Sequence, residues 1–188
     1  MERPEGNDEW LVGLVGEPEA RKVEIHEHRP EWAERFERER AKIAAALPHA
    51  RAIEHVGSTS VPGLGAKPIV DIQVEVDSLD EARDIPPLEA AGYILRVCEP
   101  NHLMVRTAER DVHVHLWADE SDLDRHLLFR DWLRTNSADR AHYEAVKREL
   151  ATHTWRDMND YAYAKSEVVN DITARAEAWA AATGWHRD

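Results

Sequence analysis

The sequence predicts a mixed α/β (α+β) domain, in which a mixed β-sheet is flanked by helices and followed by a helical C-terminal part. Three observations lead to this fold class. Strand-like and helical segments alternate along the first two thirds of the chain. Residues 69–76 alternate strictly between apolar and polar side chains, as a strand with one buried face does. After residue 117, apolar residues recur at helical spacing.

The composition is that of a globular protein with a hydrophobic core. The chain has 188 residues, of which 43% are hydrophobic and 32% are charged, so we expect one domain with a small extension. It carries 24 Lys and Arg against 37 Asp and Glu, a formal net charge of −13. This acidity counts against a broad nucleic-acid surface, which needs clustered basic residues, and against docking on an anionic membrane.

The cysteine content and the absence of targeting signals indicate a reducing compartment. A single thiol, Cys98, excludes an internal disulfide and a Cys-rich metal site. The N-terminus shows no basic segment followed by an apolar run, and no apolar run approaches the ~18 residues that a membrane span needs. We therefore expect a cytoplasmic protein.

The N-terminal part is expected to hold an arm, an edge strand and a helix. Residues 1–22 are polar and acidic and should form a loosely ordered arm ahead of the domain, residues 23–183. The segment from Val23 to Glu27 alternates and predicts an edge strand. Pro30 opens a helix that Pro48 ends. The residues on its inward stripe are Trp32, Phe36, Ile43 and Leu47.

Two strands and a loop of small residues come next. We expect a short strand from Arg51 to Val56, a loop from Gly57 to Gly65, and a strand from Ile69 to Val76. The apolar face of the second strand must pack on helices. Its opposite face carries Ile69, Asp71, Gln73 and Glu75.

The remaining elements are one interrupted helix, three strands and three helices. Ser78 and Glu81 match a capping box, and the helix that begins there should break at Pro86-Pro87. Antiparallel strands are expected at 93–98, 102–107 and 112–117. Helices should then begin near Ser121 and after a cap at Ser137, and the last helix should run from about Asp157 to Ala182.

The loop from Gly57 to Gly65 has the composition of a phosphate-binding loop. Glycines let a backbone approach a ligand closely, and hydroxyl and N–H groups suit phosphate oxygens. It is not a Walker A loop, because the expected Gly-Lys-Ser/Thr is replaced by Pro62-Gly63-Leu64. The alternative is a tight structural connection between two strands.

Asp71 places a carboxylate in the middle of a strand that is otherwise buried. Such a group is costly unless it is paired, hydrogen-bonded or metal-bound. Gly57-Ser58, then twelve residues, then Asp71 resembles the signature of the nucleotidyltransferase superfamily. In that signature, two carboxylates at period-two spacing hold Mg²⁺ against a nucleoside triphosphate.

The resemblance is closest to the GrpB family. It rests on the run HVGSTSVPGLGAKPIVDI (residues 55–72), on His113-Val114-His115, on HLLFRDWLR (residues 126–134), and on Tyr161 with Lys165. It covers residues 23–176 and implies a nucleotidyltransferase-like fold. In this family the domain is also found fused to dephospho-coenzyme A kinases.

The candidate metal ligands depart from the superfamily pattern. Gln73 stands where a second carboxylate is expected, and an amide is a weaker ligand for a hard cation. His113 and His115 share a strand face and could join Asp71 in a set that suits Zn²⁺, Fe²⁺ or Mn²⁺ better than Mg²⁺. Alternatively, one histidine acts as a general base, or both are hydrogen-bonded sheet residues.

The residues that the sequence nominates fall into two groups. Asp71, His113 and His115 are the candidates for catalysis and for binding a divalent metal, Mg²⁺ or Mn²⁺ with Zn²⁺ as the alternative. The candidates for binding a small phosphorylated ligand are Gly57, Ser58, Thr59, Ser60, Lys67, Arg130 and Lys165. Three functions remain open: a nucleotidyl-transferring enzyme, a non-catalytic ligand-binding module, and a transition-metal enzyme that uses the histidines.

Overall fold

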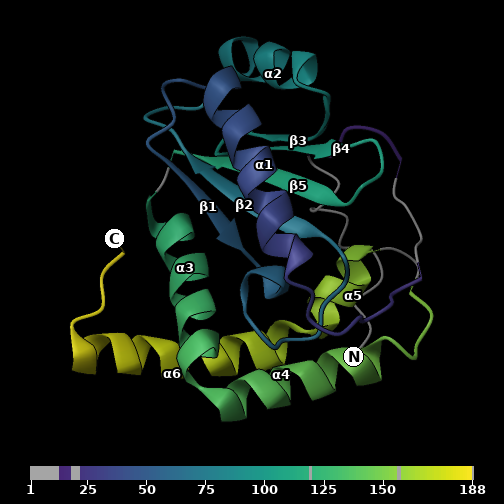
Figure 1. Ribbon diagram of the computed structural model, residues 1–188, viewed down its shortest axis with the longest axis vertical. Helices are drawn as coiled ribbons and strands as arrows, with labels where there is room; N and C mark the ends of the chain where they lie inside the picture. The colour runs from purple at the N-terminus through teal and green to yellow at the C-terminus, as the bar shows by residue number, and fades with distance from the viewer. Residues whose placement is uncertain (1–12, 18–21, 119, 156–157, 188) are drawn as a thin grey trace.

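One mixed sheet of five strands organises the protein. The structure, a computed structural model, describes residues 13–17, 22–118, 120–155 and 158–187 (Figure 1). The strand order is β1-β2-β5-β4-β3. Strands β2 and β5 are parallel, and the other neighbouring pairs are antiparallel. The strands are β1 (Ala52–Val56), β2 (Val70–Glu75), β3 (Tyr93–Glu99), β4 (His102–Thr107) and β5 (Val112–Trp117).

The apolar face of the sheet packs against two helices, as the alternation in residues 69–76 predicts. Helix α1 (Glu31–Ala46) crosses this face and helix α2 (Glu81–Ala90) covers its end (Figure 1). The side chains of Val70, Ile72 and Val74 are at most 2% exposed. They share one core with Trp32, Phe36, Ile43 and Leu47 from the predicted stripe.

The polar face of the sheet is partly covered by the C-terminal helices. Helix α3 (Glu120–Thr135) packs on β1, β2 and β5. Helices α4 (Ser137–Leu150) and α6 (Ser166–Thr183) pack against α3 and each other, with the short α5 (Met158–Ala164) beside them (Figure 1). The predicted fold class, a mixed sheet flanked by helices with a helical C-terminal part, is confirmed.

The N-terminal segments attach to the sheet without forming a regular strand. Residues 13–17 of the predicted arm lie against β3, where Leu14 bridges Val97 and the Cys98 N–H donates to the Gly13 carbonyl at 2.7 Å. The rest of the arm up to residue 21 lies outside the described residues. The prediction of an edge strand at 23–27 is wrong. This segment has an irregular backbone conformation, and it forms a single β-bridge, between His26 and Ala66.

Two helix starts differ from their predicted caps. Asp80 rather than Ser78 caps α2, and Asn136 rather than Ser137 caps α4. In both cases the side chain accepts a hydrogen bond from the backbone N–H three residues later, which is the geometry a cap needs.

Two helices differ from the prediction in where they are interrupted. Pro86 and Pro87 lie inside α2, although proline removes an N–H donor and usually breaks the interior of a helix. The long C-terminal helix is instead divided at Lys165, between α5 and α6. Neither proline nor glycine stands there, so local sequence gives no sign of the break.

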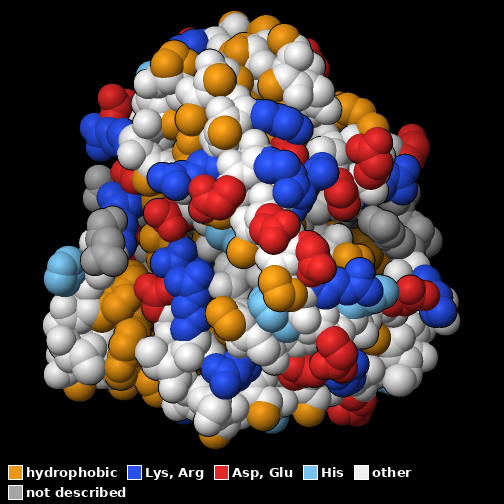
Figure 2. Space-filling model, in the orientation of Figure 1, with side chains coloured by type: hydrophobic (Ala, Val, Ile, Leu, Met, Phe, Trp, Pro, Cys, Tyr) orange, Lys and Arg blue, Asp and Glu red, His pale blue; other side chains and the backbone are white. Residues whose placement is uncertain are grey.

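The charged surface is mixed on the face shown in Figure 2. Acidic and basic side chains lie interleaved there over helix α1, for example in the ion pair between Arg40 and Glu37 at 3.5 Å. Within the described ranges, none of the helices combines the length and the apolar character needed to cross a membrane.

Candidate functional site

The site lies where β1 ends and where β2 and β5 begin. The register pairs Val56 with Asp71 and Asp71 with His113, and it pairs Gln73 with His115. Because side chains alternate along a strand, Asp71, His113 and His115 project from the same face of the sheet. The parallel pairing of β2 with β5 thus brings Asp71 next to two histidines that lie more than 40 positions later in the sequence.

These three side chains form a group that fits a metal ion. Their ligand atoms lie within 4.8 Å of one another. Asp71 Oδ1 is 3.4 Å from His113 Nδ1, and the two side chains are 34% and 22% exposed. The set of two imidazoles and one carboxylate has the donor chemistry of a Mn²⁺, Fe²⁺ or Zn²⁺ site.

The protonation states of Asp71 and His115 suit a cation. Burial lowers the pKa of His115 to about 3, with further lowering by the charges of His102 and His113, so its imidazole is neutral at physiological pH. Burial alone would raise the pKa of Asp71, but the hydrogen bond and charge of His113 outweigh it and the pKa is lowered. A carboxylate and a neutral imidazole are the forms that bind metals.

A chain of hydrogen bonds orients His115 from behind. Its Nδ1 lies 2.9 Å from His102 Nε2, and His102 Nδ1 lies 3.3 Å from Glu99 Oε2. The ring of Trp117 stacks on His102 with centroids 4.0 Å apart. If His115 donates from Nδ1 and His102 donates to Glu99, the Nε2 of His115 carries the lone pair that a metal needs.

Gly57 lets the loop approach Asp71 closely. Its φ is +69°, and a Cβ atom at this position would lie 2.7 Å from Asp71 Oδ2. The residues after it form the short helix η2 (Ser58–Ser60). Thr59 Oγ1 donates to the Ile69 carbonyl at 3.0 Å and Ser60 Oγ donates to the Gly57 carbonyl at 2.6 Å. These two hydroxyls therefore hold the loop together, although the sequence nominated both for ligand binding.

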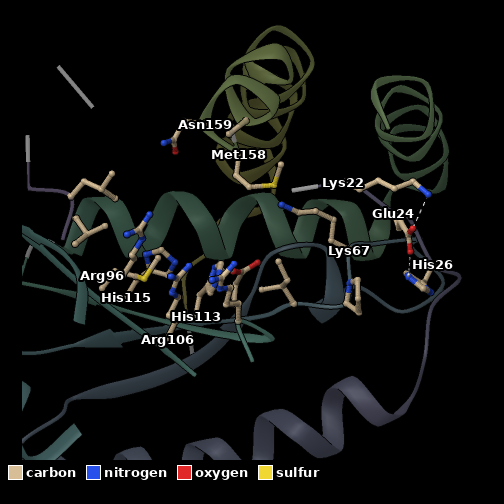
Figure 3. Close-up of a pocket in the computed structure, with 18 residues that line it drawn as sticks. Lys22, Glu24, His26, Lys67, Arg96, Arg106, His113, His115, Met158 and Asn159 are labelled. Carbon is tan, nitrogen blue, oxygen red and sulfur yellow. Dashed lines mark ion pairs between the residues drawn. The ribbon is translucent and has the colours of Figure 1, made fainter. Parts of the chain in front are cut away.

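A cavity of about 620 Å³ opens beside the three candidate metal ligands. Figure 3 shows His113, His115, Arg96 and Arg106 rising from the strands, with Met158 of helix α5 across from them. Lys67 projects into the same space. Although the protein as a whole is acidic, this wall of the cavity is basic.

A second, smaller cavity of about 150 Å³ adjoins the first. The two share Lys67, Ile69 and Asp71. The smaller cavity is also lined by Ser58 from the loop and by Tyr143, Lys147, Tyr161 and Lys165 from the C-terminal helices. Five of the seven nominated ligand-binding residues line this cavity together with Asp71: Gly57, Ser58, Thr59, Lys67 and Lys165.

Sequence reasoning missed Lys147, which joins the loop to helix α4. Its side chain is 3% exposed, and its Nζ donates to Ser58 Oγ at 3.0 Å and to the Gly65 carbonyl at 2.5 Å. Burial and the charge of Lys165 lower the pKa of Lys147 to about 7. The available signal was its position on the apolar stripe with Tyr143, Val146 and Leu150.

Arg130 lies apart from the other nominated residues. Its guanidinium pairs with Glu54 at 2.9 Å and with Asp131 at 2.8 Å, so it is an ion-paired residue between helix α3 and β1, and neither cavity includes it. Two other residues on the same face of β2 as Asp71, namely Glu75 and Gln73, are ion-paired or buried. Glu75 pairs with Arg187 at 2.8 Å, and Gln73 is 2% exposed.

Known proteins are similar to this chain in sequence and fold over most of its length. The family model described as "GrpB protein" matches residues 22–175. A UPF0157 protein of Streptomyces coelicolor is 49% identical over 173 residues, which cover 91% of this chain and 93% of that protein. The crystal structure of the conserved protein GrpB from Enterococcus faecalis has a TM-score of 0.72 and 31% identity, and the match covers 83% of this chain and 99% of that one.

A longer relative carries the same region as part of its chain. A protein of Mycolicibacterium paratuberculosis named dephospho-CoA kinase is 32% identical over 188 aligned residues, which cover 83% of this chain and 46% of that protein. This match agrees with the fusion that the family resemblance implied.

Proposed function

Since this chain belongs to the GrpB family, we propose that it is a divalent-metal-dependent enzyme that transfers a nucleotidyl or related phosphoryl group from a small phosphorylated ligand. The observation that carries the proposal is the meeting of Asp71, His113 and His115 within 4.8 Å at the mouth of a basic cavity. A metal site beside clustered cations is the arrangement that phosphoryl chemistry needs.

The chain's own residues would divide the work between metal and ligand. Asp71, His113 and His115 would hold the ion, and Lys67 with Lys165 would hold phosphate oxygens. When bound, the metal would supply Lewis-acid stabilisation of the charge that develops on a phosphoryl oxygen. Two imidazole ligands favour Mn²⁺ or Zn²⁺ over Mg²⁺, which prefers oxygen.

Gln73 supports a second candidate, a ligand-binding module without transfer chemistry. It occupies the position of the superfamily's second carboxylate, and its side chain is buried. A single carboxylate leaves less negative charge to hold two cations at once. The protein would then bind the same phosphorylated ligand and release it unchanged.

Calorimetry with Mn²⁺ and Zn²⁺, followed by ³¹P NMR with a panel of nucleoside triphosphates, tests both candidates. The wild type should bind one ion, and Asp71→Ala should lose at least about 100-fold in affinity, as expected for the loss of one charged ligand. Asp77→Ala, which removes an exposed carboxylate (69% exposed) after β2, is the matched control and should bind normally.

The outcomes separate the two candidates. Metal-dependent release of pyrophosphate or phosphate supports the enzyme, whereas binding of metal and nucleotide with no product supports the module. Failure of the wild type to bind either ion, or equal binding by the Asp71→Ala variant, would overturn the proposed metal site.

A further inference from the structure

The smaller cavity contains two lysine ammonium groups that have no carboxylate partner among the described residues. Lys147 is buried, and both of its hydrogen bonds go to neutral oxygens, Ser58 Oγ and the Gly65 carbonyl. Lys165 lines the same cavity. Among the described residues, neither lysine has a carboxylate within ion-pairing distance. A desolvated ammonium group without a counter-charge is costly, so a bound anion would stabilise both.

Aromatic rings hold the ammonium groups without neutralising them. Lys165 Nζ lies 4.7 Å from the centroid of the Tyr161 ring, and Lys67 Nζ lies 5.1 Å from the same centroid. Lys147 Nζ lies 4.6 Å from that of Tyr143. A cation over a ring face gains some attraction and keeps its full charge. Lys147 and Lys165 thus keep their charge and remain able to attract an anion, and Lys67 lies over the same ring as Lys165.

A buried hydroxyl supplies a further donor in the same place. The Tyr161 side chain is 1% exposed, and its hydroxyl has no hydrogen-bond partner within the described ranges. Tyr161 lines the smaller cavity together with the lysines. An unsatisfied buried hydroxyl costs free energy that an acceptor oxygen would recover. Two independent features, uncompensated charge and an unpartnered donor, therefore point to the same kind of ligand.

The size of the cavity limits what it can hold. Its volume of about 150 Å³ admits a tetrahedral oxyanion, whereas the adjoining 620 Å³ has room for a larger group. Asp71, the candidate metal ligand, stands on the boundary between the two. A ligand could therefore place one end in each cavity and lie across the metal site.

We propose that the smaller cavity is a subsite for one terminal phosphoryl group, held by Lys147, Lys165 and the Tyr161 hydroxyl. This deepens the proposed function by naming its substrate class: a molecule that ends in a phosphate monoester or polyphosphate and extends into the larger cavity. The lowered pKa of Lys147, caused by burial and by the charge of Lys165, agrees with an ammonium group that awaits a counter-charge.

Calorimetry and thermal shift with inorganic phosphate, on metal-free protein, test the subsite. Phosphate should bind and raise the melting temperature, whereas acetate at equal ionic strength should not. Lys147→Met should weaken phosphate binding at least about tenfold, and Tyr161→Phe, which removes only the hydroxyl, about threefold. Arg175→Met removes an exposed positive charge on α6 and is the matched control, expected to bind as the wild type does.

The Asp71→Ala variant separates this proposal from the proposed function. It should lose the metal and still bind phosphate, because the subsite is built from other side chains. Lack of phosphate binding by the wild type, or a stabilisation that acetate reproduces, would overturn the subsite and leave the metal site standing. Phosphate binding that is unchanged in both Tyr161→Phe and Lys147→Met would also overturn the subsite. If the lysine variant does not fold, unchanged phosphate binding in Tyr161→Phe is sufficient to overturn it.

Discussion

Two buried charged residues, Glu39 on helix α1 and Lys147 on helix α4, are treated in opposite ways by their surroundings. Glu39 is 1% exposed, and it accepts a hydrogen bond from the Tyr93 hydroxyl at 2.5 Å and pairs with Arg35 and Lys42, each at 3.1 Å. Lys147 is 3% exposed, donates hydrogen bonds to two neutral oxygens and lies over the Tyr143 ring, with no carboxylate among its hydrogen-bond partners in the described ranges. A buried charge that is paired within the chain has a structural role, whereas a buried charge without a counter-charge indicates a ligand-binding site.

The same contrast extends to the two faces of the sheet. On the face under α1 and α2, apolar side chains from every strand form one core. On the other face, Asp71, His113 and His115 border open space. Changes on the first face should therefore act on stability, and changes on the second should act on binding.

Removing the compensated charge should cost the most stability. Glu39→Ala leaves the Tyr93 hydroxyl without its acceptor and two basic groups without their shared partner, so the free energy of unfolding should fall by about 3 to 5 kcal/mol. Urea unfolding followed by tryptophan fluorescence measures it. At pH 7, Lys147→Met should change the same quantity by less than about 1 kcal/mol. A loss in Lys147→Met as large as in Glu39→Ala would contradict the distinction between the two residues.

The uncompensated lysine should make stability depend on pH. The pKa of Lys147 is about 7 in the folded protein and 10.5 for an ordinary lysine, so between these values the unfolded chain binds more protons than the folded one. Unfolding free energy should therefore rise with pH across that interval, by at most about 1.4 kcal/mol per pH unit from this group.

The measurement is the difference between wild type and Lys147→Met at several pH values, since other titrating groups cancel. The difference should grow above pH 7 and level off near 10.5. A difference that is constant with pH would show that Lys147 titrates normally.

The hydrogen-bond chain behind His115 should affect metal binding more than stability. His102→Ala removes the acceptor at His115 Nδ1, and the affinity for Mn²⁺ should fall about 10- to 100-fold. His102→Gln, whose amide oxygen can accept the same hydrogen bond, should recover part of the loss. His153→Ala, at an exposed position after α4, is the control. Equal affinity in His102→Ala and wild type would mean that His115 needs no orienting partner.

The smallest effect should come from a methyl group at the loop. Gly57→Ala and Gly63→Ala both place alanine at a positive φ, so both should lose stability. Gly57, whose ψ is −173°, lies in a region that only glycine readily adopts, and its substitution should cost about 1 to 3 kcal/mol. Only at Gly57 would the new Cβ meet Asp71, at 2.7 Å from Oδ2, whereas nothing lies within 4 Å of it at Gly63. Mn²⁺ titration should show weaker binding in Gly57→Ala alone. Identical metal affinities in the two variants would contradict the close approach of this loop to the site.

Much of the fold follows from local patterns in the sequence. The alternation at 69–76 predicts correctly which side chains of β2 enter the core, and the stripe on α1 predicts its buried residues. The break at Lys165 and the continuation of α2 through Pro86-Pro87 were not predictable in this way. Both depend on how the helices pack, which can override the preferences of single residues.

The site divides along the same line. Its acidic and histidine members were nominated from strand periodicity and from the family resemblance, and the structure brings Asp71, His113 and His115 together. Arg130 was nominated as well, because it follows an apolar stripe closely, yet Glu54 and Asp131 engage it elsewhere. Lys147 was missed because a lysine at helical spacing is typically a solvated residue.

By itself, the sequence determined which side chains lie on the same face of each strand and helix. This follows from the periods of two residues in a strand and 3.6 residues in a helix, and it does not depend on the rest of the chain. Only the tertiary structure decided which faces meet. The parallel pairing of β2 with β5 places Asp71 beside His113, and the packing of α4 on the loop places Lys147 at Ser58. Such meetings join residues 42 and 89 positions apart, and their free energy comes from the whole core rather than from the residues that meet.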